Sequence, residues 1–153
     1  MFDKPRIVYI IGLLWLALST FFIFWGVYSF TIVIDIPNWD LAAGGSDILP
    51  SILHFGYTMS TIAWFVFSSL FIVFAYGTVR GDHWVWSTGL IFSTIFLALF
   101  GLMLTAFMIN AVAYPNIFSV GGLITTIIAF LIDLGIVFFL TRPNAKIYFG
   151  EIK

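Results

Sequence analysis

The sequence contains no cysteine and very little charge. With no thiol among 153 residues, disulfides, thiolate metal sites and catalytic cysteines are excluded. Only 8% of the residues are charged, whereas an average soluble domain carries about 25%. The net charge of −1 comes with no basic face that could neutralise phosphates, which argues against nucleic-acid binding. Because 62% of the chain is hydrophobic, its main surrounding is expected to be the lipid bilayer.

Four long apolar runs predict four membrane-spanning helices. They cover residues 7–34, 51–76, 84–113 and 117–141, and each exceeds the roughly 20 residues that a span requires. A cleaved signal peptide would have an apolar region of only about 7–15 residues, so the first run is expected to stay in the mature protein. The prediction is an all-α integral membrane four-helix bundle, with residues 1–153 forming a single transmembrane domain.

The segments between the runs are rich in residues that end helices. Prolines, glycines and three aspartates predict an acidic outer loop over residues 35–50. Residues 77–83 predict a tight polar turn, and Pro143 is expected to stop the last helix shortly after its lipid boundary.

All six basic residues fall on one side of this four-span topology. They are Lys4, Arg6, Arg80, Arg142, Lys146 and Lys153. The other side has no base and carries the acids Asp35, Asp40 and Asp47. The positive-inside rule therefore predicts a multi-pass protein of the plasma membrane with both termini in the cytoplasm.

Small and hydroxyl residues recur at helical spacing in three of the runs. In lipid such residues let helix backbones approach closely, so they predict packing faces. The predicted packing residues are Gly12, Ser19 and Gly26 in the first run, Ala98 and Gly101 in the third, and Gly122, Thr126 and Ala129 in the fourth.

Asp133 is the one charged residue inside an apolar run. A carboxylate at membrane depth costs at least about 2.5–3.5 kcal/mol, so it needs a partner or a proton. Counting helical rise from the basic side predicts its neighbours at the same depth. They are Ser68 and Ser69 in the second run, Ser93 and Thr94 in the third, and Trp15 in the first. Three interpretations stay open: a protonated carboxyl bonded to these hydroxyls, a proton or cation relay, and a contact with another subunit.

The two histidines do not build a metal or haem site. His54 and His83 fall at opposite membrane boundaries, so they cannot ligate one haem together. His54 with Asp47 gives two ligands, short of the usual three or four protein ligands. No catalytic residues, metal or cofactor are therefore expected.

The tail carries a resemblance. The order Arg142-Pro143, then Lys146, then Tyr148-Phe149 is similar to the tail of small prokaryotic multi-span membrane proteins. The Trp84-Val85-Trp86 entry to the third run is similar too. The resemblance covers the second half of the chain, and it implies a helical membrane hairpin and no particular activity.

The features together favour a non-catalytic integral membrane subunit. Its expected partners are other integral membrane subunits of a larger complex, or copies of itself in a homo-oligomer. The first alternative is an oligomeric ion channel or proton-coupled transporter that uses Asp133. The second is a membrane-embedded enzyme subunit, such as an accessory subunit of a membrane oxidoreductase.

Overall fold

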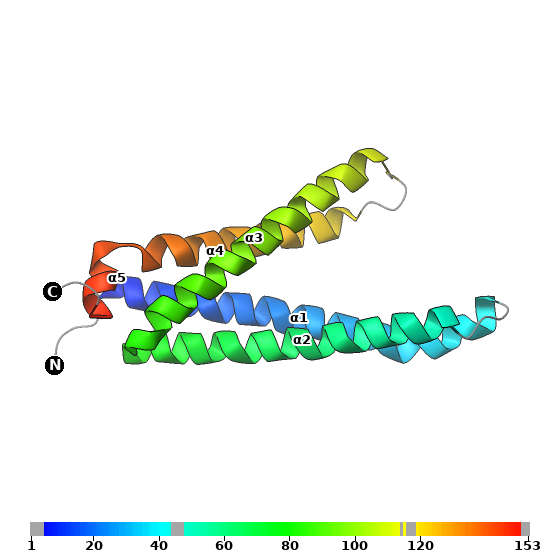
Figure 1. Ribbon diagram of the computed structural model, residues 1–153, viewed down its shortest axis with the longest axis horizontal. Coiled ribbons are helices and arrows are strands. Elements are labelled where there is room, and N and C mark those ends of the chain that lie inside the picture. Colours follow the sequence, from blue (N-terminus) through cyan, green and yellow to red (C-terminus); the bar gives the residue numbers. More distant parts are fainter. Residues whose placement is uncertain (1–4, 44–47, 114, 116–118, 151–153) are drawn as a thin grey trace. The chain divides into compact units, whose positions relative to one another are not determined.

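The computed structural model describes residues 5–43, 48–113, 115 and 119–150. This part of the chain is helical: α1 (Arg6–Ala43), α2 (Ile48–Arg80), α3 (His83–Ala113), α4 (Val120–Leu140) and the short α5 (Pro143–Tyr148) (Figure 1). Four stretches are long and apolar enough to cross a membrane, namely Arg6–Ile34, His54–Arg80, His83–Ala113 and Val120–Leu140. The prediction of an all-α chain with four such helices is confirmed, and it suggests a multi-pass membrane protein.

The chain forms two compact units. Unit 1 combines residues 1–18 with 73–153, and unit 2 comprises residues 19–72. Unit 1 therefore holds the start of α1, the end of α2 and all of α3, α4 and α5. Within it α3 packs against α4 and crosses it obliquely (Figure 1).

The core of unit 1 is built around a buried tryptophan. Trp15 is fully buried, and its ring centroid lies 5.0 Å from that of Phe74. A Cβ at Gly89 would lie 3.1 Å from the indole and 3.8 Å from Leu140, so the glycine makes room for the ring between α1, α3 and α4. An aromatic side chain buries a large area, so the space that Gly89 leaves on α3 lets the Trp15 ring be buried there, which stabilises the contact.

Unit 2 is held by aromatic packing and one serine pair. The ring of Phe22 lies 5.2 Å from those of Trp64 and Phe71. One turn away, the Ser19 hydroxyl donates to the Ser68 carbonyl at 3.1 Å and lies 2.9 Å from the Ser68 hydroxyl. Both serines are buried, so the pair satisfies two polar groups that would otherwise face apolar surroundings.

The end of α2 is a Schellman motif. Gly81 has φ = 85°, a left-handed conformation that favours glycine. The Asp82 N–H donates to the Gly77 carbonyl at 3.0 Å, and the Gly81 N–H donates to the Thr78 carbonyl at 3.2 Å. These two bonds define the motif and satisfy two of the last carbonyls of α2.

The motif brings the start of α3 close to the last turns of α2. α3 begins at His83, and a Cβ at Gly77 would lie 2.5 Å from Val85 Cγ2. Val85 is fully buried and β-branched, so it cannot easily move aside. Gly77 is therefore required by this close approach.

Two further helix-end carbonyls are satisfied by side chains from other elements of unit 1. The Tyr148 hydroxyl, on α5, donates to the Val79 carbonyl of α2 at 3.1 Å. The Trp86 indole N–H, on α3, donates to the Leu140 carbonyl of α4 at 3.0 Å. The last carbonyls of a helix have no intrahelical donor, so each of these bonds is worth about 0.5–1.5 kcal/mol.

The helices are longer than the sequence pattern indicates. The predicted outer loop 35–50 is wrong over most of its length, because α1 continues to Ala43 and α2 begins at Ile48. Residues 44–47 lie outside the described residues. A single proline such as Pro37 removes one hydrogen bond and can be carried inside a helix, and Leu41-Ala42-Ala43 favour helix.

Three other boundaries differ from expectation. The predicted turn 77–83 shrinks to Gly81 and Asp82, because α2 reaches Arg80. The fourth helix starts at Val120, with Ser119 as N-cap, rather than at residue 117. The tail beyond the end of the last span contains α5, which was not predicted and whose first residue, Pro143, has a φ suited to that position.

Candidate functional site

Asp133 lies on the buried face of α4. That face repeats every three to four residues and consists of Gly122, Thr126, Ala129, Asp133, Ile136 and Leu140. Asp133 is fully buried. At about 1.5 Å per residue, it lies roughly 10 Å along α4 from Leu140 and roughly 20 Å from Val120.

Ser93 of α3 lies beside the Asp133 carboxyl. Both side chains are fully buried where α3 packs against α4. The Ser93 hydroxyl interacts with the Asp133 carboxyl, but no hydrogen bond of good geometry reaches any of their three oxygens within the described part of the chain. Most buried polar side-chain atoms in proteins are hydrogen-bonded, so three unpaired oxygens in one place mark this pair as the candidate site.

The surroundings of the pair are apolar. The buried face of α3 consists of Val85, Gly89, Ser93, Phe96 and Phe100. Ser93 lies one turn beyond Gly89, against which Trp15 packs. Ala129 and Ile136 are the buried residues of α4 on either side of Asp133. The Asp133 carboxyl and the Ser93 hydroxyl are thus two polar groups enclosed by apolar side chains.

The other predicted neighbours of Asp133 are placed differently. Thr94 is exposed, and its hydroxyl donates to the Leu90 carbonyl of its own helix at 2.7 Å. Ser68 belongs to unit 2, where it pairs with Ser19, and the exposed Ser69 donates to Phe65 at 2.9 Å. Thr94 is turned away because Ser93 occupies the packing face of α3, and adjacent helical residues do not share a face.

The small residues predicted to pack fall into two groups. In α1 and α4 they are buried; these are Gly12, Ser19, Gly26, Gly122, Thr126 and Ala129. In α3 they are not: Ala98 is exposed, and a Cβ at Gly101 would meet nothing within 4 Å. Ala98 and Gly101 therefore lie off the face of α3 that packs within the chain, which is formed by Val85, Gly89, Ser93, Phe96 and Phe100.

Complete burial limits the chemistry that Asp133 can perform. A direct contact between Asp133 and a second protein is not compatible with a carboxyl that is fully covered by its own chain. The described residues contain no group of three His, Asp or Glu arranged to hold a metal ion. What the pair offers is an acid and a hydroxyl that can exchange a proton when the surrounding helices give access.

Sequence reasoning missed the two side-chain donors that close the ends of α2 and α4. Neither Tyr148 nor Trp86 was predicted to donate to a helix-end carbonyl. The donors lie 69 and 54 residues from the carbonyls that they reach, so no local sequence signal predicts these bonds.

Comparison with known proteins finds no matching family model, no matching curated protein and no matching solved structure. The similarity of the tail to small prokaryotic membrane proteins therefore stays a resemblance. The function has to be argued from the residues of this chain alone.

Proposed function

We propose that this protein is a non-catalytic, multi-pass subunit of the plasma membrane that packs against other membrane-spanning helices, with both termini in the cytoplasm. The orientation rests on the basic residues, which all flank the same side of the four-span topology. In unit 1 the described bases adjoin the ends of the spans, namely Arg6, Arg80, Arg142 and Lys146.

The observation that carries the subunit proposal is the unused small-residue face of α3. Thr94, Ala98, Gly101 and Thr105 recur at helical spacing, and the structure leaves Gly101 without a neighbour at its Cβ position. A lipid-facing surface has no need of small residues, whereas a helix–helix contact does. The face therefore suits a helix from another chain, either a different subunit or a second copy.

Co-purification in mild detergent tests this proposal. The expected result is recovery of other spanning polypeptides, or of a homo-oligomer, in fixed ratio. Gly101→Leu should abolish that association while leaving the monomer folded, because nothing inside the chain occupies the space around Gly101. Gly121→Leu is the matched control, since Gly121 is equally open but lies off this face. A lone wild-type monomer, or equal loss in both variants, would contradict the proposal.

A second candidate function is proton-coupled transport or ion conduction. It is favoured by the buried Asp133–Ser93 pair, because intramembrane carboxyl groups commonly mark proton and ion pathways. Reconstitution in liposomes tests it: Asp133→Asn should abolish proton or cation flux that the wild type supports. Equal flux in the two proteins would remove Asp133 from any transport mechanism.

A further inference from the structure

Arg142 is held in place at the end of the last apolar span. α4 ends at Leu140, and Arg142 is the N-cap residue of α5. Its guanidinium carbon lies 4.0 Å from the centroid of the Phe138 ring. A guanidinium stacked on an aromatic face keeps its N–H donors in a defined plane, whereas a free arginine samples many rotamers.

The charge of Arg142 is not neutralised by the described part of the protein. The ion pair found there joins Arg80 to Asp82, with 3.4 Å between Arg80 Nε and Asp82 Oδ1. Arg142 and Lys146 have no carboxylate within ion-pair distance among the described residues. Their N–H groups therefore remain available to an external anion.

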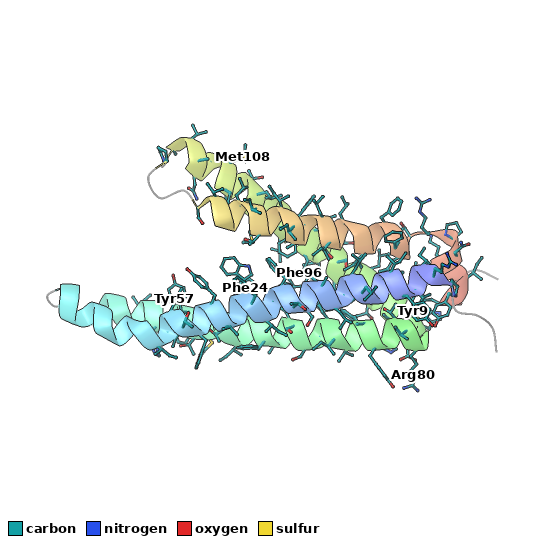
Figure 2. All side chains as sticks on the ribbon, turned by 180° about the vertical axis from the view of Figure 1, so that it is seen from behind. Tyr9, Phe24, Tyr57, Arg80, Phe96 and Met108 are labelled. Carbon is teal, nitrogen blue, oxygen red and sulfur yellow. The ribbon has the colours of Figure 1, made fainter. Side chains whose placement is uncertain are left out.

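Lys146 lies one helical turn beyond Arg142. The Lys146 backbone N–H donates to the Arg142 carbonyl at 3.1 Å, which fixes the two residues on successive turns. The two basic residues therefore lie within one turn of each other at the start of α5. Figure 2 shows Arg80 and Tyr9 at this same end of unit 1, with Arg80 projecting away from the ribbon.

We propose that Phe138, Arg142 and Lys146 form a site for the phosphate headgroup of an anionic phospholipid. Guanidinium groups bind phosphate oxygens through two parallel hydrogen bonds, and a nearby lysine adds a second positive charge. Phe138 is 49% exposed on a helix apolar enough to face lipid, so its ring lies where acyl chains meet headgroups. This position selects a lipid rather than a free anion. The inference rests on the proposed membrane placement.

Native mass spectrometry of the full-length protein in mild detergent tests the site. The probes are phosphatidylglycerol, which is anionic, and phosphatidylcholine, which is neutral overall. The wild type should bind phosphatidylglycerol in preference. Arg142→Gln should lower that affinity by more than about fivefold, because one basic charge near an anionic headgroup accounts for about fivefold and the paired hydrogen bonds of the guanidinium are lost as well. Arg80→Gln removes the same charge from a paired residue and should leave the affinity within about twofold.

Two further variants separate a built site from general attraction. Arg142→Lys keeps the charge but loses the planar fork, so it should lose most of the selectivity. Phe138→Leu keeps an apolar residue but removes the ring, so it should also weaken binding. Tryptophan fluorescence checks that each variant is folded; Arg142 and Phe138 are both exposed, so the fold should be retained.

Four results would each overturn the site. They are equal binding of the two lipids, a wild-type affinity in Arg142→Lys, equal losses in Arg142→Gln and Arg80→Gln, and displacement of the lipid by millimolar inorganic phosphate. The subunit proposal fails by a different observation, namely that neither other membrane-spanning polypeptides nor further copies of this chain co-purify with it. Release of the protein from membranes by alkaline carbonate would instead refute the membrane placement itself.

Discussion

Replacing Asp133 by leucine is expected to make the protein more stable. Asp133 is fully buried, and neither carboxyl oxygen has a hydrogen-bond partner among the described residues. Leucine has the same branch at Cγ, with two methyl groups in place of the two oxygens. The substitution therefore removes unpaired polar atoms from an apolar setting without opening a cavity.

The magnitude follows from two opposing effects. A buried polar group without a partner costs about 1–3 kcal/mol, which the leucine variant recovers. The methyl groups are larger than the oxygens, and overpacking in a close-packed interior costs about 1 kcal/mol or more. Between Ala129 and Ile136 of the same face, the net gain should be about 0–2 kcal/mol.

Equilibrium unfolding in detergent micelles measures this gain. The six tryptophans provide a fluorescence signal, and wild type, Asp133→Leu and Asp133→Asn are compared under identical conditions. Asp133→Asn is the control, because it keeps the size and polarity of the side chain and should give much less than the leucine gain. If Asp133→Leu is less stable than the wild type by more than about 1 kcal/mol, the carboxyl has a stabilising partner and the reasoning is refuted.

Three other predictions concern the packing and the helix ends. Burial, and then the charges of nearby groups, raise the pKa of Tyr148. The contribution of Tyr148 to stability should therefore be full below about pH 10 and be lost as the pH rises through the raised pKa. Thermal unfolding followed across this pH range should show the loss in the wild type and not in Tyr148→Phe. Ser19→Ala and Ser68→Ala should each cost about 0.5–1.5 kcal/mol and the double variant no more than one of them, because the two hydroxyls bond each other. Gly77→Ala should lower stability by about 1–3 kcal/mol through its clash with a buried valine, whereas Gly121→Ala, where a Cβ meets nothing within 4 Å, should not.

The apolar helices and two of their packing faces were predictable from the sequence. The spans follow from run length alone, because a bilayer requires about 20 apolar residues. The buried faces of α1 and α4 follow from small residues at helical spacing, and Gly12 and Gly122 both lie in them. On these helices the small-residue rule and the packing agree.

The packing face of α3 was not predictable by the same rule. Its buried residues include Phe96 and Phe100, and its small residues Ala98 and Gly101 face outward. A glycine indicates that a second helix can approach closely, but it does not indicate whether that helix belongs to the same chain or to another one. The indole of Trp15 packs against Gly89, and Ser93 lies buried on the same face of α3 one turn further on.

The loop boundaries failed for a different reason. Proline and aspartate over residues 35–50 are typical of loops, yet α1 extends to Ala43 and α2 starts at Ile48. The uncharged run of 28 residues at 7–34 already forms a helix, and a formed helix propagates at little cost per residue. A single proline or aspartate therefore shifts the end of the helix only slightly. At the tail, the expected stop near Pro143 agrees with the end of α4 at Leu140, but α5 was not anticipated, because a proline can also occupy the first position of a helix.

The bond between Tyr148 and Val79 has a consequence for the order in which the molecule is completed. The acceptor is synthesised 69 residues before its donor, and at a rate of about 5–20 residues per second it waits roughly 3–14 s for that donor. During this time water at the bilayer surface has to occupy the carbonyl. The end of α2 is therefore closed only after α5 has been synthesised, and a chain shortened to residue 141 would lack this donor.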